Sequence, residues 1–315
     1  MQRITFLNHY TFVLLVIMAI MGAVLPLSSQ AQAQPSNTSA PVKKLRIGVS
    51  VPAADHGWTA GIGWWARRAM ALHPNIEWRY ATADKPEKQI ADIEDMLARG
   101  VDGLVILATE SAPLTPIAKK AHEQGVYIVN VDRGFLEPVA DVFLEGDNRA
   151  FGRKSAEFIV QKTGGKANLV ILRGIPSTVD TDRFEAAMEV FKAHPGIKVL
   201  AEQPGFWNRQ KALEVMQNFL NKHKQIDVVW ASDDDMALGA EQAIREARRE
   251  KDMWIFPGAG MKDIVKKSDG QGPDVPGQYH LSALNDRDGY SHGSIQFERW
   301  QPPASQSVLS PAHRD

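Results

Sequence analysis

Short apolar runs and longer amphipathic stretches alternate along most of the chain. In its first half the apolar runs have strand-like composition and lie at 45–51, 76–83, 103–108, 127–132 and 142–147. The stretches between them carry apolar residues at helical spacing, at 58–72, 85–99, 114–124 and 148–162. Gly100 and Gly125 stand where helix C-termini favour glycine. This alternation is typical of a parallel sheet with helices on both faces.

The same alternation begins again after the Gly-containing segment "KTGGKAN" at 162–168. Further strands are predicted at 168–174, 197–203, 227–232 and 253–260, and further helices near 182–194, 209–223 and 235–250. The chain is therefore predicted to form two similar α/β lobes. We place the N-terminal lobe at 35–147 and the C-terminal lobe at 148–267, because the helix that starts at Asn148 should belong to the second lobe.

The first 34 residues have the features of a signal peptide. Arg3 precedes an apolar stretch from Phe12 to Leu27, and the small residues Ala31 and Ala33 fit a signal-peptidase site. The alternative is a membrane anchor, although the stretch is short for a span of roughly 20 residues. Since the chain has no cysteine, it has no lipid-anchor site. We expect export, with cleavage near Ala33.

Charge and composition exclude several classes of function. A formal net charge of -1 offers no basic face for nucleic acid. The absence of cysteine excludes disulfides, thiolate metal sites and a cysteine nucleophile.

Polar and aromatic residues gather where the predicted strands end. In open α/β sheets ligands bind outside the carboxyl ends of the strands. Carboxylates and guanidinium groups can each hold two hydroxyls, and an indole can cover the apolar face of a sugar ring. This chemistry suits a polyhydroxylated ligand. The candidate residues in these loops are Asp55, His56, Trp58, Asp132, Arg133, Arg183, Trp207 and Asp233.

Several of these residues also have structural interpretations. Asp132 and Arg133 could be an ion pair that only closes a strand, and loop tryptophans such as Trp58 and Trp207 often pack lobes together. Two further tryptophans, "WW" at 64–65, lie on the first predicted helix, and at least one should belong to the core. In "DDD" at 233–235 we take Asp233 as the ligand-facing residue and one of the next two aspartates as the helix N-cap.

No motif of an enzyme is present. The chain has no GxSxG elbow, HExxH or Walker loop, and "GIGWW" at 61–65 lacks the third glycine of a dinucleotide-binding fingerprint. His56 beside Asp55 could be a general base, but no partner motif follows. The sequence therefore predicts a protein without catalytic activity, cofactor or metal.

Three segments resemble one known family. They are "VDRGF" at 131–135, "QPGFWNRQKALEVMQNFL" at 203–220 and "ASDDDMALGA" at 231–240. In these segments the chain is similar to the periplasmic sugar-binding proteins of ABC transporters, in the ribose and galactose group with the type I fold. The likeness runs from about Leu45 to Lys267.

The resemblance implies a periplasmic receptor whose two lobes close by a hinge over a monosaccharide or sugar alcohol. It would act as a monomer and contact the membrane only through the permease that receives the sugar. By position it implies ligand contacts from Asp132, Arg133, Arg183, Trp207 and Asp233, and from Trp58 with Asp55 or His56. Many members carry an aspartate where this chain has Ala259, so one hydroxyl contact is missing here.

Two other classes remain as alternatives. Regulators of the lactose-repressor type share this architecture but begin with a helix-turn-helix, where this chain has its leader. A periplasmic hydrolase or isomerase would turn over the sugar that it binds.

The tail at 268–315 departs from the family. The resemblance implies a return crossing to the first lobe, whereas this segment is dense in Gly, Pro, Ser and Asp, a composition that resists packing. Permitted codons for 268–293, read one base later, give "VMDKDPTFPANITYPPSMIATAIHMA", a plausible strand and an apolar-periodic helix. The hypothesis is a one-base insertion near the codons of Lys267 and Ser268, and the alternative is a divergent, disordered tail.

Overall fold

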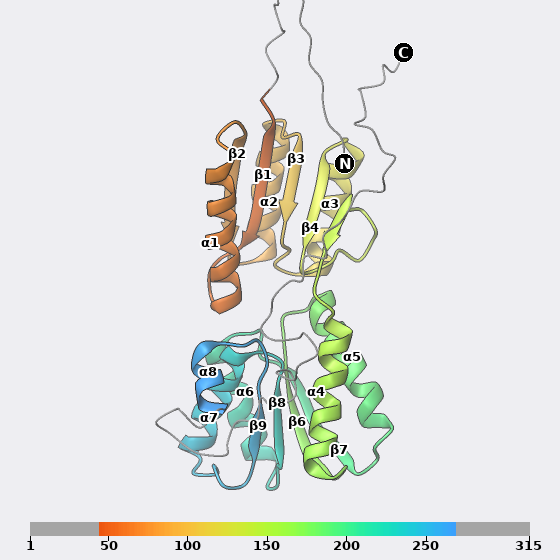
Figure 1. Ribbon diagram of the computed structural model, residues 1–315, viewed down its shortest axis with the longest axis vertical. Coiled ribbons are helices and arrows are strands. Elements are labelled where there is room, and N and C mark those ends of the chain that lie inside the picture. The colour runs from red at the N-terminus through yellow and green to blue at the C-terminus, as the bar shows by residue number, and fades with distance from the viewer. Residues whose placement is uncertain (1–43, 269–315) are drawn as a thin grey trace, which may run out of the picture. The chain divides into compact units, whose positions relative to one another are not determined.

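Two parallel sheets form the framework of the protein. The computed structural model describes residues 44–268, so the predicted leader and tail lie outside the described residues. The first sheet has the order β2-β1-β3-β4-β5, with β1 Arg46–Pro52, β2 Glu77–Ala83, β3 Gly103–Ile106, β4 Tyr127–Val131 and β5 Val142–Leu144 (Figure 1). The second has the order β7-β6-β8-β9, with β6 Ala167–Arg173, β7 Ile197–Pro204, β8 Val228–Ala231 and β9 Trp254–Phe256. The predicted α/β fold class is confirmed.

A helix follows every strand except β4 in the chain order of the described residues. The helices are α1 Gly57–Leu72, α2 Pro86–Ala98, α3 Ser111–Glu123, α4 Asn148–Thr163, α5 Thr178–Lys192, α6 Arg209–Lys222, α7 Asp234–Glu246 and α8 Lys262–Ser268. Gly100 and Gly125 follow the ends of α2 and α3 with φ of 71° and 79°, a region that glycine enters without strain. The prediction for these two glycines is confirmed.

Some element boundaries differ from the prediction. α3 begins at Ser111 rather than at 114, because a proline in the first helical turn, here Pro113, lacks only an N–H that would have no helical partner. α5 begins at Thr178 rather than near 182, since the Ser177 side chain accepts the backbone N–H of Asp180 as an N-cap. The strands at 142–144 and 254–256 are shorter than predicted, and α8 was not predicted.

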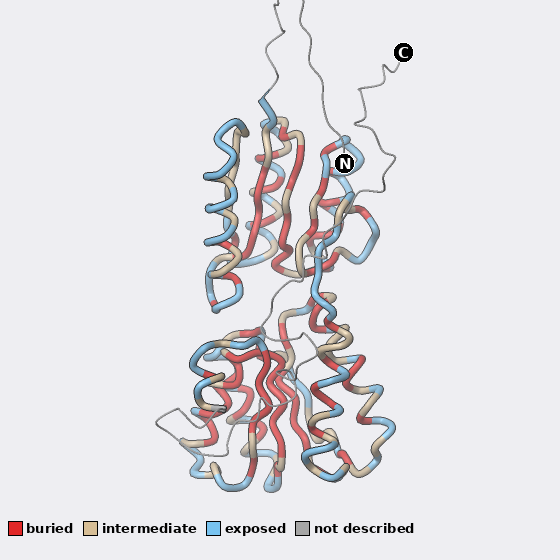
Figure 2. Tube along the Cα trace, in the orientation of Figure 1, coloured by how far each residue is buried: buried red, intermediate tan, exposed pale blue. Residues whose placement is uncertain are grey.

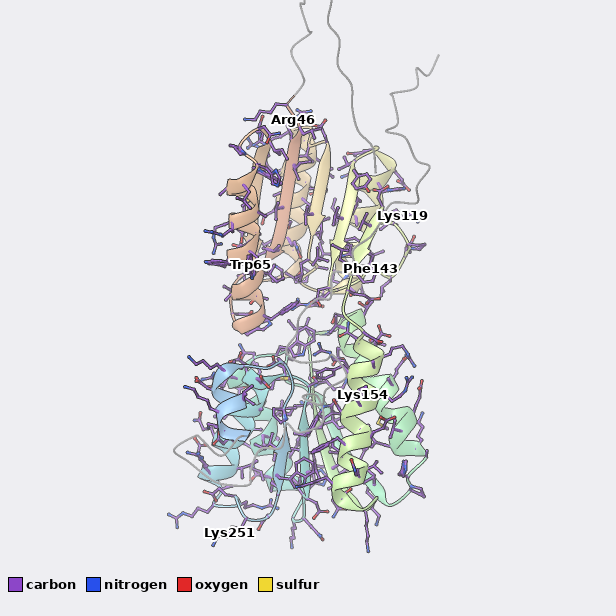
Figure 3. All side chains as sticks on the ribbon, in the orientation of Figure 1. Arg46, Trp65, Lys119, Phe143, Lys154 and Lys251 are labelled. Atoms are coloured by element: carbon purple, nitrogen blue, oxygen red, sulfur yellow. The ribbon has the colours of Figure 1, made fainter. Side chains whose placement is uncertain are left out.

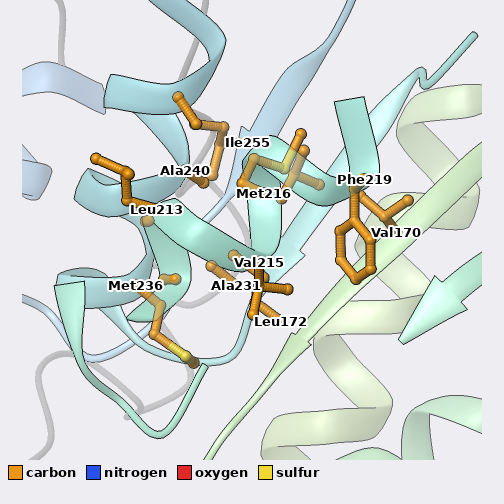
Figure 4. Close-up of a cluster of buried hydrophobic side chains, with 14 of the residues drawn as sticks. Val170, Leu172, Leu213, Val215, Met216, Phe219, Ala231, Met236, Ala240 and Ile255 are labelled. Atoms are coloured by element: carbon orange, nitrogen blue, oxygen red, sulfur yellow. The ribbon is translucent and has the colours of Figure 1, made fainter. Parts of the chain in front are cut away.

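The second sheet is covered on both faces. One face packs on α4 and α5 through Ala156, Ile159 and Phe191. The other packs on α6, α7 and α8 through a larger cluster that includes Leu172, Met216, Phe219 and Ile255 (Figure 4). In a parallel sheet that is buried on both sides, nearly every strand position is apolar, which explains the fully buried run of β8.

The first sheet is covered unevenly. Leu104, Ile106 and Ile128 pack beneath α2 and α3 on one face. Among residues 44–268, α1 is the one helix on the other face, and Figure 2 shows that most of α1 is exposed or half-buried. The prediction that Trp64 or Trp65 belongs to the core is wrong, because these side chains are 51% and 65% exposed. Figure 3 shows Trp65 projecting from α1 away from the sheet.

The parallel arrangement places the predicted polar residues at one edge of each sheet. All neighbouring strands are parallel, so the loops that follow the strands lie together. Among the described residues no helix has the length and apolar character needed to cross a membrane.

Candidate ligand-binding site

The Asp132–Arg133 pair occupies a sharp turn at the end of β4. Asp132 has φ of 63°, which is uncommon for a residue other than glycine. Its backbone N–H donates to the carbonyl of Leu144 at 2.7 Å, and the N–H of Arg133 donates to that of Val131 at 2.8 Å. At this turn Arg133 is fully buried, whereas Asp132 is half-buried.

Arg133 is fully buried and only partly paired. Its Nη1 donates to the carbonyls of Ala108 at 3.1 Å and Thr109 at 2.9 Å. Its Nε and Nη2 have no hydrogen-bond partner among the described residues. Burial lowers the pKa of Arg133 to about 10, against the opposing charges of Asp132 and Asp55. The two free nitrogens form a fork that matches two adjacent oxygen atoms.

The loop between β1 and α1, together with the first turn of α1, adds three predicted residues. The His56 ring lies buried with Nδ1 2.6 Å from Oδ1 of Asp55, and the Thr59 hydroxyl donates to the same carboxylate at 3.0 Å. Burial raises the pKa of Asp55, but the bonds from His56 and Thr59 and the charge of His56 outweigh it, so the pKa lies below its ordinary value. Trp58 Nε1 donates to Oδ2 of Asp132 at 3.2 Å.

Arg183 is held within the second lobe by two bonds. Its Nε donates to Asn148 Oδ1 and its Nη1 to the carbonyl of Ser232, each at 3.0 Å. The guanidinium carbon lies 4.2 Å from the ring centroid of Phe151. Burial lowers its pKa, and the carboxylates of Asp132 and Asp233 oppose that shift.

Trp207 follows β7 in a strained loop. Phe206 and Trp207 both have positive φ, at 59° and 53°. Phe206 is exposed, whereas Trp207 is only 5% exposed. The indole Nε1 is buried without a hydrogen-bond partner in the described part of the chain.

The three aspartates at 233–235 have separate roles. Asp233 is the N-cap of α7 and accepts the N–H of Met236 at 3.0 Å. The prediction that Asp234 or Asp235 is the cap is therefore wrong, because the helix begins one residue earlier than expected. Burial raises the pKa of Asp233 to about 6 and that of Asp234 to about 7. Asp234 accepts the N–H of Met261, and Asp235 pairs with Arg209.

Residues of both sheets meet around Trp207. The guanidinium carbon of Arg133 lies 4.8 Å from the indole centroid, and the His56 ring centroid lies 6.4 Å from it. The N–H of Gly57 donates to Asp235 at 3.4 Å. The structure thus brings Arg133, His56 and Trp207 together. In the first lobe Asp55 bonds to His56, and Trp58 bonds to Asp132. In the second lobe Arg183 and Asp233 lie close enough to interact electrostatically with Arg133 and His56.

Sequence reasoning missed the residues that support this site. Gln89 of α2 accepts the N–H of Thr109 at 2.7 Å and donates to the carbonyl of Leu107 at 2.8 Å. Asn130 of β4 donates to the carbonyl of Arg133 at 3.0 Å. The Thr109 hydroxyl is buried without a partner among the described residues. The one sequence signal for these supporting residues is a polar residue inside an apolar strand, as at Asn130.

Comparison with known proteins defines the family. Residues 47–267 match the model of the periplasmic binding protein domain family. The chain belongs to this family. The resemblance that the sequence suggested is therefore confirmed, and the match ends at the residue where the sequence departs from the family pattern.

Three similar proteins are known by what they bind. The ribose import binding protein of Bacillus subtilis is 33% identical over 178 residues, covering 56% of this chain and 57% of its own. The galactofuranose-binding protein of Escherichia coli is 30% identical over 264 residues, covering 80% of this chain and 79% of its own. The solved binding protein of the arabinose ABC transporter from Shewanella sp. ANA-3, bound to arabinofuranose, is 30% identical with a TM-score of 0.65, covering 72% of this chain and 78% of that one.

The first of these relatives is matched over little more than half its length. All three are named as binding proteins.

Proposed function

We propose that this protein is a receptor that encloses a monosaccharide or sugar alcohol between its lobes and delivers it to an ABC-transporter permease. The observation that carries the proposal is a group of buried donors without partners at the carboxyl ends of both sheets. They are Nε and Nη2 of Arg133 and Nε1 of Trp207.

A polyol supplies the missing partners. An unpaired buried donor costs roughly 1–3 kcal/mol, and adjacent hydroxyl oxygens match the fork of Arg133. The same hydroxyls can donate to carboxylates, and Asp132 and Asp233 lie near enough to the arginines to influence the pKa of Arg183. The mixture of cations and anions favours a neutral ligand over a charged one.

The relatives support the same class of ligand. Ribose, galactofuranose and arabinofuranose, the sugars that the names of the three proteins print, are all small polyhydroxylated rings. Import and ABC transport also appear in those names, which supports a permease as the partner. The partner would be a membrane complex and not nucleic acid, with the receptor itself a monomer in the periplasm.

A thermal-shift screen tests the proposal. The mature chain is heated with D-ribose, L-arabinose, D-galactose and xylitol at millimolar concentration, with gluconate as the charged control. We expect at least one neutral compound to raise the melting temperature and Arg133→Met to abolish that rise, because ligand binding stabilises the folded state. Consumption of the bound sugar, or stabilisation by gluconate alone, would contradict a receptor for neutral polyols.

We also propose that the predicted leader directs export and is removed near Ala33. Mass spectrometry of the protein secreted into the periplasm should give a new N-terminus at Gln34. A protein that keeps residues 1–34 and sediments with membranes would instead support the anchor.

For the residues after Lys267, we propose a one-base insertion in the coding sequence. The family match ends at Lys267, and the α1 face of the first sheet has few covering residues in the described chain. The test is to read the DNA and to express a frame-restored chain beside the present one. The restored chain should melt at a higher temperature and bind less of a hydrophobic dye, and the absence of family-like coding in both adjacent frames would contradict the proposal.

A further inference from the structure

The loop that carries Trp207 is built around a glycine on the neighbouring strand. Gly174 directly follows β6, and its N–H donates to Oδ1 of Asp180 at 2.7 Å. The next connection in the sheet starts beside it, since the N–H of Gly205 donates to the carbonyl of Arg173 at 2.7 Å. Gly174 and the start of the Trp207 loop are thus fixed to adjacent strands.

The indole of Trp207 occupies the space that a side chain at position 174 would need. A Cβ atom built on Gly174 would lie 2.2 Å from Cε2, 2.4 Å from Cζ2 and 2.4 Å from Nε1 of Trp207. These separations are far below van der Waals contact, and an indole in a buried site cannot swing aside as a flexible chain does. Only glycine allows this approach.

The backbone of the loop also limits where the indole can move. Phe206 and Trp207 both have left-handed φ, a conformation that usually costs of order 1–3 kcal/mol for such residues and persists only where surrounding structure enforces it. The N–H of Asn208 closes the turn on the carbonyl of Gly205 at 3.0 Å, and the Asn208 side chain caps α6 at Lys211. Both ends of the loop are therefore anchored.

We infer that Gly174 is a positioning residue, which sets the indole of Trp207 against the guanidinium of Arg133 at the ligand site. The part of the indole that lies on Gly174 contains Nε1, Cε2 and Cζ2. The guanidinium carbon of Arg133 lies 4.8 Å from the centroid of the same indole. The ligand in this inference rests on the proposed function, whereas the packing of Trp207 on Gly174 does not depend on it.

The test compares Gly174→Ala with a matched glycine at the other end of the same sheet. A Cβ on Gly196 would lie 2.3 Å from the carbonyl oxygen of Gly165, so Gly196→Ala introduces similar crowding away from the site. The full chain is labelled with 5-fluorotryptophan, and the Trp207 signal in the fluorine NMR spectrum is assigned by its loss in Trp207→Leu. Gly174→Ala should shift or broaden that signal, while Gly196→Ala leaves it in place.

A double-mutant cycle extends the test to binding, with D-ribose and xylitol as probes. In the native background, Gly174→Ala should lower the affinity for the tighter-binding probe by about tenfold to a hundredfold. In the Trp207→Leu background the same substitution should change affinity less than about twofold, because the clash is gone. An unmoved fluorine signal, or an equal loss in both backgrounds, would overturn the inference. If neither probe binds the native chain, the proposed ligand is wrong, and the fluorine signal still decides the role of Gly174.

Discussion

The first four strands of each sheet follow the same order, yet the surroundings of the two sheets differ sharply. The second sheet has helices on both faces, while in the described part of the chain the first has α2 and α3 on one face and α1 alone on the other. Ten large hydrophobic side chains are exposed in the described part of the chain, and nine of them lie in the first lobe. Only Phe206 lies in the second.

This contrast separates what each lobe can do with its own residues. The second lobe completes its core and holds Arg183, Trp207 and Asp233 in place by itself. The first lobe holds Asp132 and Arg133 equally firmly at the carboxyl end of its sheet, but its α1 face retains apolar strand residues such as Leu144, which is 48% exposed. Soluble proteins seldom leave large apolar patches without a use, so the first lobe is where a further segment would stabilise most.

The largest expected effect comes from comparing one tryptophan in each lobe. Trp230 in β8 is 1% exposed and contacts Phe191, whereas Trp65 on α1 is mostly exposed. Trp230→Ala should lower the free energy of unfolding by about 3–5 kcal/mol through the cavity that it leaves. Trp65→Ala should change it by less than about 0.5 kcal/mol. Urea denaturation measures both, and similar losses at the two positions would contradict the unequal coverage of the sheets.

The contributions of Asp234 in the second lobe and Asp55 in the first lobe to the free energy of unfolding should change with pH in opposite directions. Burial raises the pKa of Asp234 in the second lobe to about 7. Between pH 4 and 7 the unfolded chain therefore binds fewer protons at this residue than the folded chain does. Its contribution to stability is full below the unfolded pKa near 4 and falls as the pH rises toward 7, by about 4 kcal/mol in total.

Asp55 in the first lobe provides the comparison. Its lowered pKa means that its contribution is present above the unfolded pKa and is lost as the pH falls. Urea denaturation from pH 2.5 to 7.5 should show Asp234→Asn gaining stability relative to the native chain as the pH rises from 4 to 7. Asp55→Asn should gain stability relative to the native chain as the pH falls below about 4. Parallel curves for the native chain and Asp234→Asn would show that Asp234 is ionised in the folded protein.

The fold was more predictable from the sequence than the site was. Apolar runs identify parallel strands because both faces of each strand are buried, as in β8. The left-handed φ of Asp132 and Trp207 has no sequence signal, since neither residue is glycine. The failed expectation for Trp64 has another cause, because an amphipathic pattern cannot tell whether a second element covers the helix. The prediction missed the capping role of Asp233, because α7 begins one residue earlier than the sequence pattern indicates.

The next effect concerns the two arginines of the site, of which Arg133 is buried and Arg183 half-buried. Arg133 donates to the carbonyls of Ala108 and Thr109, and Arg183 donates to Asn148 Oδ1 and to the carbonyl of Ser232. Arg133→Met should lower the free energy of unfolding by about 2 kcal/mol, because two buried acceptors lose their donor, and Arg183→Met by about 1 kcal/mol, because its two bonds are only partly buried. Arg149 pairs with Glu189 at the surface, so Arg149→Met is the control and should change stability little. An equal loss at Arg149 would mean that charge, not buried hydrogen bonding, sets these values.

The smallest effect concerns the face of the first sheet that carries α1. Leu144 pairs in register with Val131, which belongs to the α1-side cluster, and the preceding residue Phe143 points to the opposite face of the same strand. In the present chain Leu144→Ala should lower the free energy of unfolding by less than about 0.5 kcal/mol. In the frame-restored chain the same substitution should be costlier, by about 1 kcal/mol or more if a new segment buries the side chain. Phe143→Ala is the control, because its cost should be the same in both chains. If the cost of Leu144→Ala also stays the same, the restored segment does not cover this face, and the exposed apolar residues of the first lobe need another partner.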